Sequence, residues 1–368
     1  MNPDQLAHLN GVVLIAAGLI SVLLGVIMHR THFCTMGAVS DAILMGSMTR
    51  MRQWALALVV AMLGFACLCY NGLISPLQSV YATPSVLWLS TLLGGLMFGW
   101  GMVWASGCGA KTLVRMGTGN LKSLIVFVFM GLSALITIKG VLAVPRVYFL
   151  DTFDWIPVHG VFVGQWTSQA LNLSLPQGVL YAALIVAAPL VYWVCRDRGF
   201  LNFHNLSTGI AIGLVICGAW LISGVLGHGL EHPETLEEFF LATNSHKMEA
   251  LSLTAPAAMT MDALLYFSDG TKRWTFGMVS LLGIVLGAFF SGLFSGRLKW
   301  ESFTSRSDLV RHMLGGILMG VGAVMAMGCS IGQGLSGMST LSLTSLLATA
   351  AMLLGASMAL WRDLHAAV

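Results

Sequence analysis

GGLMFGWGMVWASGC at residues 94–108 recurs as GGILMGVGAVMAMGC at residues 315–329. At this constant offset, eight of the fifteen positions are identical, and they include the final Gly-Cys of each copy. In a membrane chain, a repeat of this kind is typical of two halves of one fold that meet at a central site. The repeat therefore predicts two related halves, about 11–195 and about 196–360, within a single transmembrane domain that spans residues 1–368.

The composition is that of a protein that crosses a membrane many times. Hydrophobic residues make up 57% of the 368 positions and charged residues only 9%, whereas a soluble domain carries roughly 25% charged residues. The first ten residues have no cationic segment of the kind that opens a signal peptide, so we expect 11–28 to be a retained span. The net charge of +3 then reflects basic loops on one membrane face, and it gives no indication of nucleic-acid binding.

We expect an all-α polytopic membrane protein with about nine transmembrane helices, because each apolar stretch approaches the roughly 17–25 residues that a crossing needs. Segment 251–267 carries Pro256 and Asp262, and we expect a broken or re-entrant element there. An acidic residue at membrane depth is a functional candidate, so Asp262 either pairs with a base or binds a coupling ion. The nine predicted spans are 11–28, 54–74, 86–107, 123–143, 178–195, 206–226, 276–296, 312–328 and 341–360.

The basic residues favour one orientation of these spans. With the N-terminus outside, 13 of the 18 lysines and arginines fall on the cytoplasmic side, and the acidic loop from Glu231 to Glu249 falls outside. The positive-inside rule supports this orientation, which makes the C-terminus cytoplasmic. Spans 86–107 and 312–328 then cross in opposite directions. This predicts an inverted repeat, whose equivalent residues surround a pseudo-twofold axis near the membrane midplane.

Three of the seven cysteines, Cys34, Cys108 and Cys329, follow an apolar span and precede a run of small residues. Glycines at that density break a helix, and irregular backbone at membrane depth is tolerated where it lines a polar path or is buried in protein. We expect short helix-loop-helix insertions whose tips bring the three thiols toward one axis. The alternative is close helix packing, with each cysteine acting as a small hydrophobe. The small residues that we include in this site are Gly109, Ser330 and Gly332.

Several thiols along an apolar transport path would restrict the kinds of substrate that can pass. A neutral thiol is a weak donor and a soft partner, which suits a sulphur or selenium atom better than a hard oxyanion. Broken helices add positive N-terminal ends that favour an anion. Arg30, Lys111 and Arg115 lie near two of the cysteines, where they either attract an anion to the inner mouth or are ordinary loop charges.

The alternative from another functional class is a membrane thiol oxidoreductase. Such an enzyme requires a cysteine pair close enough to form a disulfide, usually C-x-x-C, and the chain has no such motif. No spacing of cysteine and histidine resembles a zinc site. We therefore expect a transporter rather than an enzyme, with neither a metal nor a cofactor.

Three groups of residues around the cysteines carry a resemblance to a known family. They are Phe33, Cys34, Gly37, Ala38 and Asp41, then Cys108, Arg115, Gly117 and Gly119, and finally Gly328, Cys329, Gly332, Gly334, Leu335, Ser336 and Gly337. With these residues the chain resembles the YeeE/YedE family of bacterial sulphur transporters from about residue 11 to about residue 360. The resemblance implies an inner-membrane protein that takes up thiosulfate through an hourglass-shaped fold, in which Cys34, Cys108 and Cys329 form a relay at the constriction. It also implies a cytoplasmic sulphur-accepting protein as a partner.

Two features depart from that family pattern. Segment 205–220, NLSTGIAIGLVICGAW, resembles the third inserted element more weakly, and Asn202 to Asn205 stand where its tip has a cysteine. Lys111, beside the second cysteine, is not part of the pattern. Another soft sulphur or selenium compound therefore remains an alternative substrate.

Overall fold

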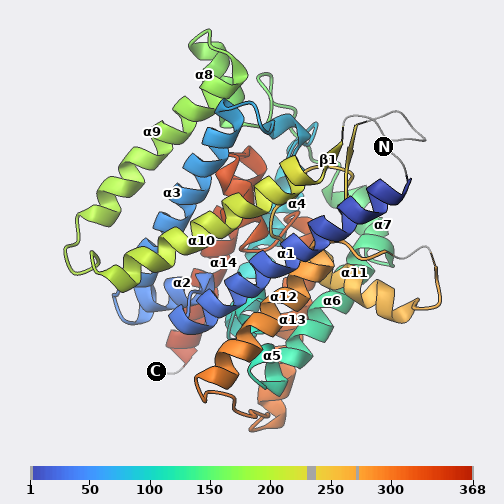
Figure 1. Ribbon diagram of the computed structural model, residues 1–368. Helices are drawn as coiled ribbons and strands as arrows, with labels where there is room; N and C mark the ends of the chain where they lie inside the picture. Colours follow the sequence, from blue (N-terminus) through green and yellow to red (C-terminus); the bar gives the residue numbers. More distant parts are fainter. Residues whose placement is uncertain (1–2, 230–237, 271–272, 367–368) are drawn as a thin grey trace.

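A computed structural model describes residues 3–229, 238–270 and 273–366 (Figure 1). The described chain is almost entirely helical. Its single sheet joins β1 (His228–Gly229) to β2 (Phe239–Phe240) in antiparallel register. Residues 230–237 of the acidic loop that we expect outside lie beyond the described residues.

Nine helices of the described chain are long and apolar enough to cross a membrane. Each overlaps one predicted span, so the prediction of an all-α polytopic membrane protein is confirmed. The spanning helices are α1 (Pro3–Thr31), α3 (Thr49–Tyr70), α4 (Trp88–Trp104), α6 (Leu121–Lys139), α9 (Leu175–Cys195), α10 (Phe203–Leu221), α12 (Phe276–Phe294), α13 (Arg306–Met325) and α14 (Leu343–Ala366).

Shorter elements continue from several of these helices. A crossing needs at least about 17 residues, so the 12-residue α11, which occupies the predicted broken segment, is too short to make one. The short elements that follow the three cysteines are α2 (Thr35–Leu44), α5 (Gly109–Gly117) and the π-helical turn η4 (Gly332–Gly337). The remaining short elements are η1 (Pro76–Gln78), α7 (Ala143–Pro145), η2 (Arg146–Leu150), α8 (Val163–Ala170), η3 (Ile222–Leu226) and α11 (Thr254–Leu265).

The two copies of the repeated segment, on α4 and α13, pack directly against each other. A Cβ atom built on Gly94 would lie 2.7 Å from the Gly322 carbonyl oxygen, and one built on Gly101 would lie 2.7 Å from the Gly315 carbonyl oxygen. Early residues of one copy thus meet late residues of the other, so the helices cross antiparallel. The missing side chains let the two backbones approach this closely.

Each copy also packs against one further helix at an equivalent glycine. A Cβ atom on Gly99 would overlap the carbonyl oxygen of Met352 on α14, and one on Gly320 would overlap that of Met130 on α6. Gly99 and Gly320 occupy the same position of the repeat. The repeated sequence therefore encodes a repeated set of helix contacts.

Segment 205–220 forms the long helix α10, as the predicted span 206–226 requires, and not the short inserted element that the weaker family resemblance implies. Its glycines do not break the helix; Gly209 and Gly213 instead lie against Leu56 and Val60 of α3. The short helix of the second half of the chain that occupies the predicted broken segment is α11. Figure 1 shows α10 crossing the molecule beside α1, while α8 and α9 lie at its edge.

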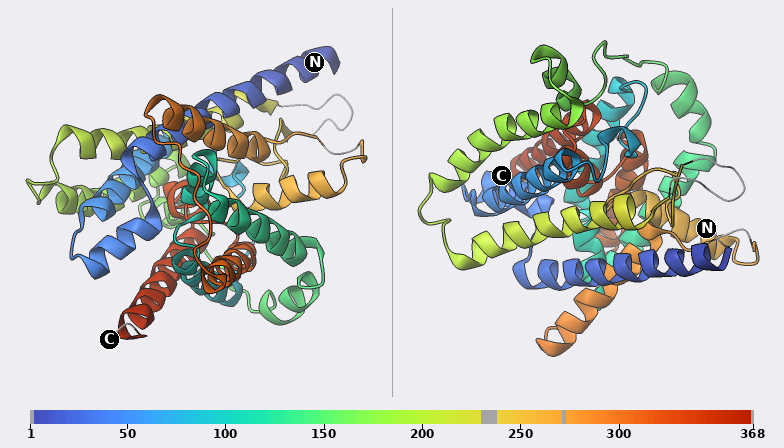
Figure 2. Two further views of the ribbon diagram at one scale, coloured as in Figure 1. Left: turned by 90° about the horizontal axis from the view of Figure 1, so that it is seen from below. Right: turned by 45° about the horizontal axis from the view of Figure 1, so that its top comes forward.

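The outer surface of the helices is apolar, as a lipid-facing surface requires. Leu19, Leu214 and Leu354, for example, are all more than half exposed. The start of α1 and the end of α14 lie at opposite ends of the molecule in the left view of Figure 2.

Candidate functional site

Each of the three cysteines follows the same break in its helix. His32, Ser106 and Met327 have φ angles of 54°, 57° and 58°, and each stands two residues before a cysteine. A left-handed backbone costs a non-glycine residue on the order of 1–3 kcal/mol, and such strain is concentrated at functional sites. The same left-handed turn thus ends the helix before each of the three cysteines, and the thiol that follows is turned inward.

Each sulphur then sits at the start of the next short element. Cys34 Sγ accepts from the Gly37 amide at 3.5 Å, and Cys329 Sγ accepts from the Gly332 amide at 3.4 Å. Cys108 is the N-cap of α5 and faces the corresponding Lys111 amide, although no cap hydrogen bond forms there. The first amides of a helix have no partner within it, so these sulphurs lie where backbone donors are available.

The fold gathers the three thiols in its interior. The sulphurs of Cys34 and Cys108 are 3.5 Å apart, although the residues are 74 positions apart in the chain. Ser330, the residue after Cys329, lies close to Cys108, so the loop of Cys329 also approaches that thiol. Cys34, Cys108 and Cys329 are only 3%, 1% and 0% exposed. The three thiols therefore lie in a part of the interior that water does not freely reach.

The small residues of the predicted site have different roles. A Cβ atom on Gly332 would lie 2.7 Å from the Ser252 hydroxyl oxygen, so the turn η4 has no room for a side chain there. Gly109 is less confined, because its nearest neighbour would be 3.8 Å away. Ser330 is 2% exposed, and its hydroxyl has no hydrogen-bond partner within the described residues.

Two polar residues that the sequence analysis missed hold the Cys329 loop. The Tyr81 hydroxyl donates to the Gly332 carbonyl oxygen, and burial raises the pKa of Tyr81, which keeps it a donor. The Gln333 amide nitrogen donates to the carbonyl oxygens of Ala326 and Met327 at 3.0 and 2.9 Å. Both side chains line a cavity of about 50 Å³ beside this loop. Gln333 could have been noticed as a large polar residue among small ones, but nothing in the sequence singles out Tyr81.

A larger cavity of about 320 Å³ carries most of the positive charge near the thiols. Lys111 and Arg115 line it, as their predicted role in attracting an anion requires, whereas Arg30 is exposed and is not among its lining residues. The sequence analysis did not connect the other basic residues, since they come from distant parts of the chain. They are His29, His32, Arg50 and Arg297.

Asp262 has a basic partner. Its carboxylate lies 3.1 Å from Lys139 Nζ, so the α11 carboxylate is paired with the end of α6. Of the two expected roles for Asp262, the structure shows the ion pair. No group of three or more metal-binding side chains is found among the residues searched, which are those the structure describes.

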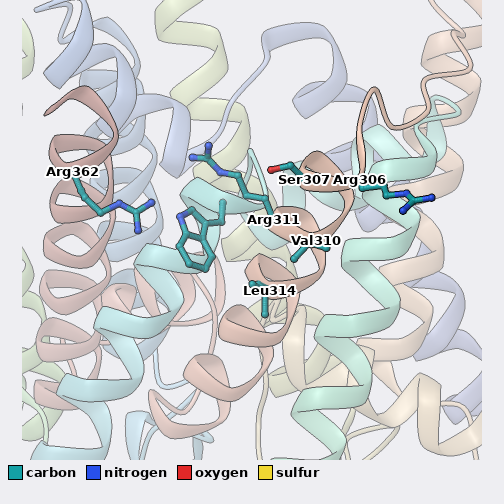
Figure 3. Close-up of a pocket in the computed structure, with 7 residues that line it drawn as sticks. Arg306, Ser307, Val310, Arg311, Leu314 and Arg362 are labelled. Carbon is teal, nitrogen blue, oxygen red and sulfur yellow. The ribbon is translucent and has the colours of Figure 1, made fainter. Parts of the chain in front are cut away.

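A third pocket, of about 420 Å³, lies away from the thiols at the ends of α13 and α14. Arg311 and Arg362 reach toward it, whereas Arg306 points away (Figure 3). Asp363 pairs with both Arg311 and Arg362, so their charge is partly neutralised. This pocket contains none of the residues predicted from the sequence.

Comparison with known proteins identifies the family. The profile described as sulphur transport matches residues 30–358, a range that includes all three thiols. The chain belongs to the sulphur transport family. A thiosulfate transporter, TsuA of Escherichia coli (strain K12), is 27% identical over 333 residues, which cover 84% of this chain and 83% of that protein. Thiosulfate transporter TsuA of Spirochaeta thermophila (strain ATCC 700085 / DSM 6578 / Z-1203) is 26% identical over 325 residues, which cover 83% of this chain and 86% of that protein. The family resemblance seen in the sequence is confirmed, and it supports a transport role for this multi-pass membrane protein.

Proposed function

We propose that this protein takes up thiosulfate across a bacterial inner membrane and passes it along Cys34, Cys108 and Cys329. The observation that carries the proposal is the 3.5 Å contact between the Cys34 and Cys108 sulphurs, beside the loop of Cys329. The two relatives named as thiosulfate transporters support the choice of substrate. In this proposal the N-terminus is outside and the C-terminus is cytoplasmic.

The chemistry of thiosulfate suits a row of buried thiols. The ion is a dianion with one soft terminal sulphur, and a charge at the bilayer centre costs at least a few kcal/mol. Backbone amides at the starts of α2 and α5 and near η4 offset part of that cost. Each S–H···S contact is weak, because a thiol is a weak donor. The ion can therefore move from one thiol to the next without being held too tightly to leave.

The charges near the path assist release on the inner side. Lys111 and Arg115 line the basic cavity next to the thiol pair and attract the anion toward the cytoplasm. Arg30 contributes only at longer range, because it is exposed beside that cavity. A cytoplasmic sulphur-accepting protein is the partner that would take the ion after release.

Two alternatives lead to different experimental results. Another soft sulphur or selenium compound would use the same thiols with a different specificity. A thiol oxidoreductase would use the close pair of Cys34 and Cys108, which the fold provides without a C-x-x-C motif. The family match favours transport over this enzyme. An enzyme would need a bound redox partner, and it would not concentrate labelled thiosulfate in vesicles.

The test is growth on thiosulfate of a bacterium that lacks its own sulphate and thiosulfate uptake. The unaltered protein should restore growth, and Cys34→Ala, Cys108→Ala or Cys329→Ala should abolish it, because each removes one thiol of the row. Cys195→Ala is the matched control, since Cys195 is exposed and distant in sequence from the three breaks. Serine replacements at the same three positions test whether a soft sulphur atom is needed. We expect each of them to lower thiosulfate uptake at least about tenfold.

Normal growth with the Cys329→Ala protein, at the same membrane level as the unaltered protein, would overturn the relay. Failure of the unaltered protein to restore growth on thiosulfate, with uptake of a selenium compound instead, would favour the alternative substrate.

A further inference from the structure

The 320 Å³ cavity beside the thiols, which we name the inner basic cavity, is built from several separate elements. α1 and the break after it supply His29 and His32, α3 supplies Arg50, α5 supplies Lys111 and Arg115, and the segment after α12 supplies Arg297. Six basic side chains thus converge on one space, although they span most of the chain. Phe33, Met28, Val114 and Thr118 complete its wall.

Four of the six side chains carry a full positive charge at pH 7, and little of that charge is neutralised; the four are Arg50, Lys111, Arg115 and Arg297. Arg50 Nε lies 3.3 Å from the Asp41 carboxylate, and Arg115 Nη1 donates to the Ser106 carbonyl oxygen at 3.1 Å. Within the described parts of the chain, no carboxylate forms an ion pair with Lys111 or Arg297. The pocket of Figure 3 is the contrast, because Asp363 pairs with two of its arginines. The inner basic cavity therefore has a net positive charge that a bound anion would neutralise.

The cavity adjoins the thiols but differs from them in chemistry. Phe33 precedes Cys34 and Lys111 follows Cys108 by three residues, and both side chains line the cavity. Lys111 also lies within electrostatic range of Cys34. Guanidinium and ammonium groups bind oxyanions through charge and strong N–H···O hydrogen bonds, so they bind the oxygens of sulfate and of thiosulfate alike. The thiols favour an ion that carries a soft sulphur atom, whereas the cavity favours any small ion that carries negative charge.

We infer that the inner basic cavity is a second anion site, which holds a small dianion on the cytoplasmic side of the thiols and accepts sulfate as well as thiosulfate. This inference rests on the proposed function for the position of the cavity along the path. Sulfate has the same charge and shape as thiosulfate but lacks the soft sulphur. Cytoplasmic sulfate therefore enters this site without crossing the thiols, and it slows thiosulfate uptake by occupying the place into which thiosulfate is released.

Binding to the purified full-length protein provides the first test. Sulfate and thiosulfate should each stabilise the protein against heat, and raising the concentration of sodium chloride should weaken both effects because salt screens the charges. Arg297→Gln and Lys111→Gln should each weaken sulfate binding about tenfold, as expected for the loss of one charged hydrogen-bond donor. Arg306→Gln, which removes the same charge outside the inner basic cavity, should bind sulfate as the unaltered protein does.

The second test measures uptake of labelled thiosulfate into proteoliposomes that contain sulfate. Internal sulfate should slow uptake by the unaltered protein and by Arg306→Gln, but much less by Arg297→Gln. Equal inhibition of Arg297→Gln and the unaltered protein would overturn the inference, as would unchanged sulfate binding in both the Arg297→Gln and Lys111→Gln proteins.

A protein with alanine at Cys34, Cys108 and Cys329 separates this inference from the proposed function. It should still bind sulfate and thiosulfate at the inner basic cavity while transporting neither. If this triple variant transports thiosulfate normally, the relay is wrong and the cavity can still be judged by sulfate binding. If the triple variant loses uptake while the cavity variants bind sulfate normally, the relay stands and the cavity site is wrong.

Discussion

At the scale of single residues, the contact between Cys34 and Cys108 is the most informative feature. Two sulphurs 3.5 Å apart can share a proton, and they are also near enough that a modest movement would join them at the roughly 2.05 Å of a disulfide. A transport path built on this pair is therefore open only while both thiols are reduced. The sequence predicts that the three thiols approach one axis, but it does not indicate which two are in contact, because each cysteine belongs to a separate helix break.

Mild oxidation should close the path reversibly. We expect diamide to join Cys34 to Cys108 and to stop thiosulfate uptake into vesicles, because neither sulphur can then donate to the ion. Dithiothreitol should restore uptake, and peptide mass spectrometry should identify the bond. Cys195→Ala should respond like the unaltered protein, which excludes this exposed thiol as the cause. Full uptake in a sample whose Cys34–Cys108 bond has formed would contradict a path between these sulphurs.

The residues of the candidate site were only partly predictable from the sequence. Cys34, Cys108 and Cys329 could be predicted because each is followed by glycine and other small residues in the sequence. The left-handed residues His32, Ser106 and Met327 were not predictable, since the conformation favours glycine and none of the three is glycine. Tyr81, Arg50 and Arg297 reach the site only through the tertiary fold, and inspection of one sequence does not reveal which distant segments meet.

At the scale of elements, the repeated glycines determine how α4 and α13 meet their neighbours. Gly99 lies against the backbone of α14, and Gly320 lies against that of α6. Backbone cannot move aside as a flexible side chain can, so even one added methyl group must push two helices apart. The thiol breaks follow directly after these packed helices, and a shift of either helix would move its cysteine.

Alanine at either of these glycines should therefore reduce stability. Overpacking costs typically about 1–3 kcal/mol, and Gly99→Ala and Gly320→Ala should lose similar amounts because their contacts are equivalent. Gly11→Ala on α1 is the matched control, as its Cβ atom would have nothing within 4 Å. The measurement is the thermal unfolding midpoint of the purified protein in detergent. A Gly99→Ala protein as stable as Gly11→Ala would show that α4 and α14 are not held this tightly.

The elements themselves were largely predictable, because a membrane crossing leaves a long apolar run in the sequence. All nine predicted spans correspond to helices. The arrangement of the short elements was harder to predict. Segment 205–220 has the glycines of a broken element, yet it forms α10 because those glycines face the side chains of α3. Composition cannot distinguish a glycine that breaks a helix from one that lets a neighbour approach.

At the scale of the whole molecule, the two cavities beside the thiols differ in charge. Tyr81 and Gln333 line the small cavity near the Cys329 loop, whereas six basic residues line the inner basic cavity. In the proposed orientation, the segments that supply Arg50, Lys111 and Arg297 are all cytoplasmic. The charge difference along the thiol row would then draw a dianion inward, which makes the orientation of the chain part of the mechanism.

Fusions to alkaline phosphatase test that orientation, because the enzyme needs disulfides and is active only outside the cytoplasm. A fusion after Asp154, between α6 and α9, should be active, and a fusion after Lys299, between α12 and α13, should be inactive. The physical reason is the positive-inside rule, since Arg297, Lys299 and Arg306 cluster around the second position. Immunoblots that show equal amounts of the two fusion proteins are the control. The reverse pattern of activity would place the inner basic cavity outside the cell, where it would capture thiosulfate instead of receiving it after the thiols.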